Sequence, residues 1–205
     1  WTDMGEDYAQ DVTAEDAKTF IYYIRITDNA GNVTYISTAD ATYDLTKPAI
    51  SGITNGSTYY TTQKVTVTDT NLDSVTLNGE TVTDEITLEG NKDATYTIVA
   101  TDKAGNETTC TVTMKPIASI SAPIDAITES NVNSGNTDAI AEVEAAAAAL
   151  DTTNATDAEK AAIKAITDKC DALQEVIADT AAEYERITDA IAAYDPDEVT
   201  SADKA

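Results

Sequence analysis

The sequence predicts a multidomain fold in which an all-β region of the sandwich type is followed by an all-α region, a helical hairpin or three-helix bundle. Up to Pro116, Thr, Val, Ile and Tyr alternate with polar residues, as in half-buried strands. After Pro123, Ala, Glu and Asp surround apolar side chains at helical spacing. The connector that contains both prolines separates the two patterns.

An internal repeat organises the β region. Asp28-x-Ala-Gly-Asn32, with a strand pattern on each side, recurs 74 residues later as Asp102-x-Ala-Gly-Asn106. We interpret the motif as a hairpin loop whose glycine has a positive φ and whose Asp and Asn side chains bind backbone amides. Two copies predict tandem modules of one kind.

The second copy contains seven expected strands, at residues 49–54, 64–68, 74–77, 80–82, 85–88, 95–101 and 107–114. Asn78-Gly79 predicts a two-residue hairpin turn, and Gly90 with Asn91 marks another. Alternate apolar residues are expected to face the core: Val65, Val67, Val75, Leu77, Ile86, Leu88, Tyr96, Ile98, Ala100, Cys110, Val112 and Met114.

The first copy, residues 1–47, shows only a terminal hairpin after an acidic stretch. Because a lone hairpin is marginally stable in water, we expect its missing strands to lie upstream of Trp1. The alternative is that the hairpin packs on the second copy as a cap.

These residues resemble a known family. Thr46-Lys47-Pro48-Ala49-Ile50-Ser51-Gly52-Ile53, Asn71-Leu72-Asp73-Ser74-Val75-Thr76-Leu77-Asn78-Gly79 and Thr101-Asp102-Lys103-Ala104-Gly105-Asn106 resemble bacterial Ig-like domains. The resemblance covers residues 46–114, with residues 20–48 as the last two strands of a preceding copy. It implies a module of large secreted or wall-attached Firmicutes proteins, among them multimodular glycoside hydrolases, mucin-degrading enzymes and peptidases that cut immunoglobulins.

The spacing of apolar residues in the α region predicts two helices and the start of a third. Ile140, Val143, Ala147 and Leu150 are spaced by three or four residues after a start near Thr137. Thr156-x-x-Glu159 is a capping box, and apolar spacing then continues to Tyr194, which predicts one helix over residues 157–194. A break at Thr180 is the alternative.

A further helix start is expected near Thr200, so the α region would end in a truncated helix. Composition and periodicity make the region similar to FIVAR-type helical modules. The domain assignment is therefore residues 1–47 and 48–116 for the two Ig-like modules, 117–136 for a linker and 137–205 for the helical module.

Composition excludes several functions. The chain has 37 acidic and 12 basic residues, a formal charge of −25 and no histidine. Nucleic acids and anionic membranes would be repelled, and no apolar run is long enough to cross a bilayer. Without histidine, Ser-His and Cys-His nucleophile pairs are impossible. Cys110 and Cys170 are expected to be free, buried thiols.

Calcium is the one cation that the acidic loops favour. Asp69, Asn71 and Asp73 alternate as in a calcium loop, but the rest of the pattern is missing, which favours turn hydrogen bonds. If calcium binds, it is expected at the junction near Asp44 and Asp69. No cofactor is otherwise expected.

Sugar binding would need exposed aromatic side chains. Tyr59 and Tyr60 are adjacent, so one of them points away from the core of a strand, and Tyr35 and Tyr43 flank another strand. The alternative, which we favour, is edge packing at a module junction.

The function expected from these features is non-catalytic. We expect an extracellular spacer that positions a catalytic or adhesive domain of a secreted or cell-wall-attached protein, with neighbouring modules as its partners. The alternative is an adhesion module for host glycans or glycoproteins, including immunoglobulins. Neither nucleic acid nor membrane is an expected partner.

Overall fold

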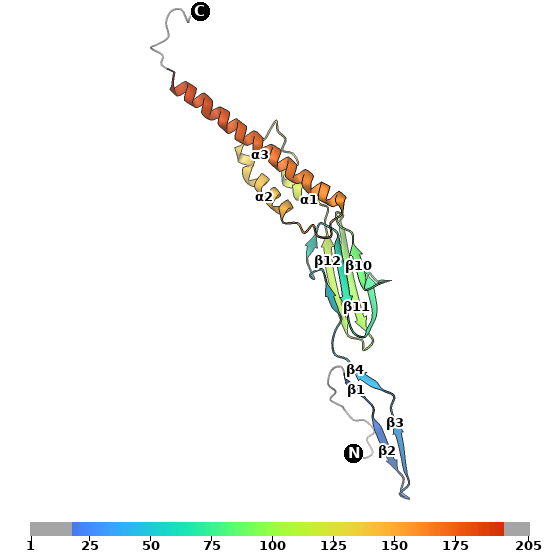
Figure 1. The fold of residues 1–205 in the computed structure, drawn as a ribbon. Coiled ribbons are helices and arrows are strands. Elements are labelled where there is room, and N and C mark those ends of the chain that lie inside the picture. The colour runs from blue at the N-terminus through green and yellow to red at the C-terminus, as the bar shows by residue number, and fades with distance from the viewer. Residues whose placement is uncertain (1–17, 195–205) are drawn as a thin grey trace, which may run out of the picture. The chain divides into compact units, whose positions relative to one another are not determined.

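The computed structural model describes residues 18–194, in which a β-rich region is followed by an α-helical region (Figure 1). This order confirms the β-then-α prediction. The chain forms two compact units. One comprises the described residues up to Ser57 with residues 64–86 and 96–112. The other comprises residues 58–63 and 87–95 with the helical region.

The first four strands are β1 (Lys18–Phe20), β2 (Tyr23–Thr27), β3 (Val33–Ser37) and β4 (Ala41–Tyr43). They pair two by two, as β1 with β4 and β2 with β3, and we call them together the β1–β4 ribbon. Strands β2 and β3 are antiparallel, with Ile24 opposite Ile36, and β1 pairs in the same sense with β4. Every residue of β2 and β3 is exposed to solvent.

Eight further strands form two sheets, in the orders β10-β7-β5 and β6-β12-β11-β8-β9. Their bounds are β5 (Ala49–Ser51), β6 (Thr58–Tyr59), β7 (Gln63–Thr68), β8 (Leu72–Leu77), β9 (Glu80–Val82), β10 (Glu85–Leu88), β11 (Ala94–Asp102) and β12 (Glu107–Met114). All seven predicted strands are present, with ends shifted by up to three residues. The extra strand, β6, pairs in parallel with β12. With only two residues, it carries no period-2 signal in the sequence.

The predicted core pattern is confirmed. Of the twelve side chains expected to face inward, ten are buried, and Leu77 and Tyr96 are half-buried. Strand β7 shows the alternation most clearly, since Val65 and Val67 are buried between exposed neighbours. Burial of one such side chain contributes about 1.5–3 kcal/mol.

The turns follow their predicted chemistry. Asn78 and Gly79 have φ values of 51° and 86°, the positive pair that a two-residue hairpin needs. Gly31 and Gly105, the glycines of the two repeat motifs, have φ values of 86° and 88°. Gly52 combines a φ of 91° with a close approach to the Lys64 carbonyl group, so any side chain there would collide with backbone.

The helical region contains α1 (Ala118–Ser121), α2 (Thr137–Ala148) and α3 (Asp157–Ala192), with 3-10 turns η1 (Ala122–Ile124) and η2 (Ser134–Asn136). The capping box at the start of α3 is confirmed: Thr156 Oγ1 accepts from the Glu159 amide, and Glu159 Oε2 accepts from the Thr156 amide. The helical core is formed by Ile117, Ile120, Ile124, Ile140, Val143, Ala147, Ile166, Cys170 and Leu173.

Helix α3 is continuous over 36 residues, which confirms the single-helix prediction and excludes a break at Thr180. The Thr180 hydroxyl donates to the Val176 carbonyl within the helix (2.8 Å) and does not cap a new one. The helix start expected near Thr200 lies outside the described residues.

The segment expected to be a linker, residues 117–136, holds α1, η1 and η2 and contributes three buried isoleucines to the helical core. Isoleucine at positions 117, 120 and 124 already has helical spacing in the sequence. The compact units also differ from the expected domain bounds, since residues 58–63 and 87–95 belong with the helices.

Candidate functional site

The two repeat loops have the same hydrogen bonds. Asp28 Oδ1 accepts from the amides of Ala30 (2.9 Å) and Asn32 (2.8 Å), and its Oδ2 accepts from the Asn32 side chain (2.7 Å). Asp102 makes the equivalent three bonds at 2.8, 2.8 and 2.7 Å, the last with the side chain of Asn106. The motif is therefore a self-contained loop in which one carboxylate satisfies two backbone amides.

These hydrogen bonds also set the acidity of both carboxyl groups. Burial raises the pKa of Asp102, but hydrogen bonds from the side chain and backbone of Asn106 and from neighbouring amides outweigh it, so the pKa lies below its ordinary value. The pKa of Asp28 is lowered by the equivalent bonds, those from Asn32 foremost. Both groups therefore stay ionised to a lower pH than an ordinary aspartate.

The second loop makes two contacts that the first loop does not make with any described residue. The Asn106 side chain also donates to the backbone carbonyl of Asp44 (2.8 Å), and the Thr108 hydroxyl donates to the carbonyl of Pro48 (2.6 Å). Together these bonds attach residues 44–48 to the β11–β12 hairpin. Residues 44–48, which contain Pro48 and which we call the entry connector, are therefore held in place by specific side chains.

Three carboxylates meet at this connector. Oxygens of Asp44, Asp69 and Asp102 lie within 4.8 Å of one another, and Asp102 is buried. Asn71 joins the group, because its side chain donates to Asp44 Oδ2 (2.7 Å) and its amide to Asp69 Oδ1 (2.7 Å). Asp73 is exposed and lies outside the carboxylate group.

The group has the oxygen chemistry that Ca²⁺ prefers. Its oxygens already accept hydrogen bonds, however: Asp44 from Asn71 and Thr46, Asp69 from Asn71, and Asp102 from its own loop. The sequence predicted a junction near Asp44 and Asp69, and named Asn71 in the Asp69 loop, but it did not place Asp102 with them. Only the pairing of β11 with β8 does so, because it places Asp102 beside Leu72.

The two candidate sugar-binding tyrosines are both half-buried. Tyr60 packs against the helical core, and the Tyr60 carbonyl accepts from the Asn91 amide (2.7 Å). Tyr59 lies in β6, where its carbonyl accepts from the Lys115 amide (2.9 Å). Neither side chain presents a fully exposed ring for stacking on a sugar, whereas Tyr23 and Tyr35 are 63% and 61% exposed.

A buried glutamate connects strand ends to helix α3. Glu159 is 4% exposed, and its Oε1 accepts from both the amide (3.0 Å) and the hydroxyl (2.9 Å) of Thr62. The same hydroxyl accepts from the Gly90 amide (3.2 Å). Beside it, the Thr61 hydroxyl donates to the Asp151 carbonyl (2.6 Å). We call Thr61, Thr62, Gly90, Asp151 and Glu159 the Glu159 network.

The Glu159 network is the feature that sequence reasoning missed. The capping box identified Glu159 as a helix-start residue, but nothing local indicated that its second oxygen binds a threonine 97 positions earlier. Gly90 is a further constraint, since a Cβ there would meet Glu159 Oε1 and the backbone of Thr61 and Thr62. Only glycine allows this approach.

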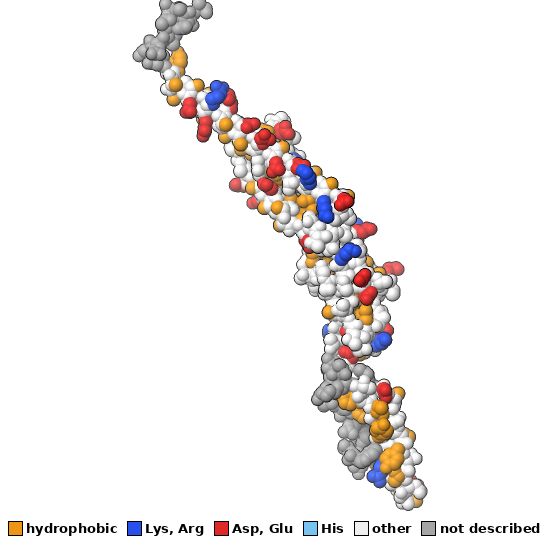
Figure 2. Space-filling model, in the orientation of Figure 1, with side chains coloured by type: hydrophobic (Ala, Val, Ile, Leu, Met, Phe, Trp, Pro, Cys, Tyr) orange, Lys and Arg blue, Asp and Glu red, His pale blue; other side chains and the backbone are white. Residues whose placement is uncertain are grey.

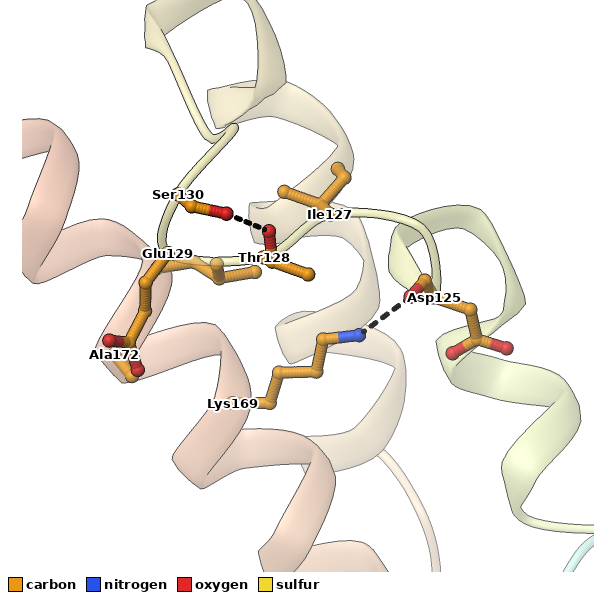
Figure 3. Close-up of a pocket in the computed structure, with 8 residues that line it drawn as sticks. Asp125, Ile127, Thr128, Glu129, Ser130, Lys169 and Ala172 are labelled. Carbon is orange, nitrogen blue, oxygen red and sulfur yellow. Dashed lines mark hydrogen bonds between the residues drawn. The ribbon is translucent and has the colours of Figure 1, made fainter.

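A hollow of about 590 Å³ lies beside the middle of α3 (Figure 3). Lys169 Nζ donates there to the carbonyls of Ile124 (2.8 Å) and Asp125 (3.5 Å), which ties η1 to the helix. No aromatic ring is among the described residues that line the hollow, and the ammonium group of Lys169 already donates to backbone carbonyls. The hollow therefore has the polar contacts of a packed turn and lacks a stacking surface.

Apart from the group of Asp44, Asp69 and Asp102, neither the acidic side chains on the face shown in Figure 2 nor the two thiols, among the described residues, form a further candidate site. Acidic side chains are spread along the face shown in Figure 2 and do not form one patch. Cys110 and Cys170 are free and buried, as predicted, and burial raises the pKa of both thiols. Both are therefore poor nucleophiles.

No family model matches the chain, and no curated protein matches it. None of the described helices is both long and apolar enough to cross a bilayer.

Proposed function

We propose that the chain is a non-catalytic spacer segment of a large exported bacterial surface protein or enzyme. In this proposal residues 48–116 are a β-sandwich that resembles bacterial Ig-like domains. Residues 1–47 are the end of a preceding module, and the helices are a hairpin or bundle module of FIVAR type. The segment would hold a catalytic or adhesive domain at a distance from the cell wall.

The Glu159 network is the observation that carries this proposal. Flexible modules are commonly joined by exposed, polar linkers. Here the ends of strands and the first turn of α3 are joined by buried hydrogen bonds, and residues 58–63 and 87–95 share one compact unit with the helices. Strand ends and a helix that are joined by buried hydrogen bonds, without an open linker, form a joint that would transmit position and force, and a spacer requires both.

The attachment of residues 44–48 to the β11–β12 hairpin supports the same proposal. Asn106 and Thr108 hold two carbonyls of the connector, so the entry to this module is also restrained. The strong negative charge keeps such a segment solvated. A spacer also needs no catalytic centre, consistent with the absence of histidine from the sequence.

The joint can be tested with spin labels at two exposed positions of the helical unit, Thr87→Cys and Ala161→Cys, because the native cysteines are buried. We expect a narrow distance distribution in the full chain. Glu159→Ala should broaden it and destabilise the unit by about 2–3 kcal/mol, since Thr62 loses a charged partner in a buried site. Glu175→Ala, at an exposed position of the same helix, is the matched control. A broad distribution in the unsubstituted chain would reject a rigid joint.

Adhesion is the second candidate function, and one observation favours it. Tyr23 and Tyr35 are strongly exposed and lie on the same face of the β2–β3 hairpin with Arg25, which is paired opposite Tyr35. Exposed aromatic rings next to a cation suit carbohydrate and glycoprotein surfaces. Saturable retention on a glycan array or from serum, lost in Tyr23→Ala with unchanged melting, would favour adhesion over spacing.

A further inference from the structure

The geometry points to the β1–β4 ribbon as an acceptor for strands. We infer that a preceding repeat of the same polypeptide, with the strand pattern of residues 49–88, pairs with the ribbon and covers the face formed by Ile24, Ile26 and Ile36. This inference rests on the proposed function, because only a multimodular chain would supply such a repeat. Beyond that function, it names the strands that complete the first module and the face and edges of the ribbon to which they bind.

The first step is that the ribbon matches β11 and β12 residue by residue. At the offset of 74 residues, Ile24 corresponds to Ile98, Ile26 to Ala100 and Ile36 to Cys110. The loops between the strands have the same three carboxylate hydrogen bonds, within 0.1 Å. The two hairpins are therefore the same structural element.

The second step is that the core face of this element is uncovered in the first copy. Ile24, Ile26 and Ile36 are 42%, 50% and 49% exposed, whereas Ile98, Ala100 and Cys110 are 0%, 0% and 5% exposed. Figure 2 shows apolar side chains on the surface of the ribbon. Three neighbouring β-branched side chains on one face of two paired strands are the pattern of a buried face.

The third step concerns the edges. In the second copy β11 pairs with β8, with Ile98 opposite Leu77 and Ala100 opposite Val75, and β12 pairs with β6. Among the described residues, β2 and β3 pair only with each other. A strand like Leu72–Leu77 would fit beside β2, and a short one like β6 beside β3.

The fourth step concerns the loop. Asn106 uses its side chain twice, for Asp102 and for the carbonyl of the connector at Asp44. Asn32 makes the first of these bonds, and the structure shows no contact of the second kind for it among the described residues. The loop of the first copy is thus shaped to hold a connector like residues 44–48.

The repeat also identifies the source of the strands. In the second copy, strands β5 to β10 take up residues 49–88 and come directly before β11 in the chain. Those strands already belong to the two sheets of their own module, so a second copy of this chain has no spare set to donate. A preceding repeat remains as the occupant.

A graft tests the inference in the full chain. Residues 48–91 are duplicated directly before Lys18 in place of residues 1–17, so that β1 is kept and the added strands meet the ribbon as they meet β11. We expect amide exchange at Ile24, Ile26 and Ile36 to slow by at least about 100-fold. The same graft with Val65→Asp and Val67→Asp in the added copy is the control and should leave exchange fast.

Unchanged exchange in a graft whose added strands are ordered would overturn the inference. If the graft does not fold, a second variant decides: residues 22–38 replace residues 96–112 in the second copy. Cooperative unfolding of that variant supports the inference. A variant that does not unfold cooperatively overturns the inference. A dimer of the unmodified chain with protected Ile24 would make a second copy the occupant and also overturn it. None of these outcomes bears on the spin-label distances that test the joint.

Discussion

The two Asp-x-Ala-Gly-Asn hairpins of this chain differ in burial and not in local geometry. Asp28 and Asp102 bind their own loops with the same three hydrogen bonds, yet Ile24 is exposed and its counterpart Ile98 is buried. A loop of five residues satisfies its own polar groups wherever it lies. Burial of the strands beside it needs partners that are distant in sequence, and the second hairpin has them.

Core truncation should separate the two hairpins most strongly. Ile98→Ala is expected to lower the free energy of unfolding by about 2–4 kcal/mol, because it opens a cavity in a fully buried site. Ile24→Ala should change it by less than about 0.5 kcal/mol, since its side chain is already solvated. Urea unfolding followed by circular dichroism measures both. Equal losses would mean that Ile24 is covered in this chain too.

The loop asparagines should differ less. Asn106→Ala removes hydrogen bonds to Asp102 and to the connector at Asp44, and is expected to destabilise the second module by about 1–2 kcal/mol. Asn32→Ala removes only the bond to Asp28 and should cost less than about 0.5 kcal/mol of global stability. Thermal melting of both variants makes the comparison. A larger effect at Asn32 would contradict the difference in contacts.

Acid should affect the two loops to different extents. Folding lowers the pKa of Asp102, so this group contributes stability above its unfolded pKa, near the ordinary value of 3.8, and loses it as pH falls through the lower folded pKa. Asp102→Asn should therefore flatten the decline of unfolding free energy in this acidic window. Asp28→Asn should leave the decline unchanged, because opening the exposed ribbon is local. Urea titrations at successive pH values test both slopes.

Calcium should have the smallest effect. Among the described residues, only the second loop lies in a group of three carboxylates, that of Asp44, Asp69 and Asp102, so any specific binding is expected there. Because these oxygens already accept hydrogen bonds, added Ca²⁺ should shift melting by less than about 1 °C beyond a sodium chloride control. A saturable rise, reversed by chelator and lost in Asp69→Asn, would instead establish a calcium site.

Much of the secondary structure could be predicted from the sequence. Period-2 alternation located seven strands, Asn78-Gly79 located a hairpin turn, and the Thr156–Glu159 capping box located the start of α3. Each of these signals acts between residues at most four positions apart. Such signals are readable because the interactions that cause them are local.

The candidate site was only partly predictable. The junction at Asp44 and Asp69 was expected, but Asp102 reaches it only through strand pairing, and Asp73 does not take part. The tyrosines singled out for sugars, Tyr59 and Tyr60, are half-buried, and Tyr60 packs on the helical core. Pairing and burial depend on partners that no local pattern specifies.

The sequence by itself determined the repeat, the loop chemistry, the helix start and the order of β and α regions. Only the tertiary structure decided that Glu159 joins Thr62, that residues 117–124 pack in the helical core and that one hairpin is buried and the other exposed. The reason is physical. Hydrogen bonds within a turn or capping box need only neighbouring residues, whereas buried contacts need surfaces brought together from 40 to 100 positions away.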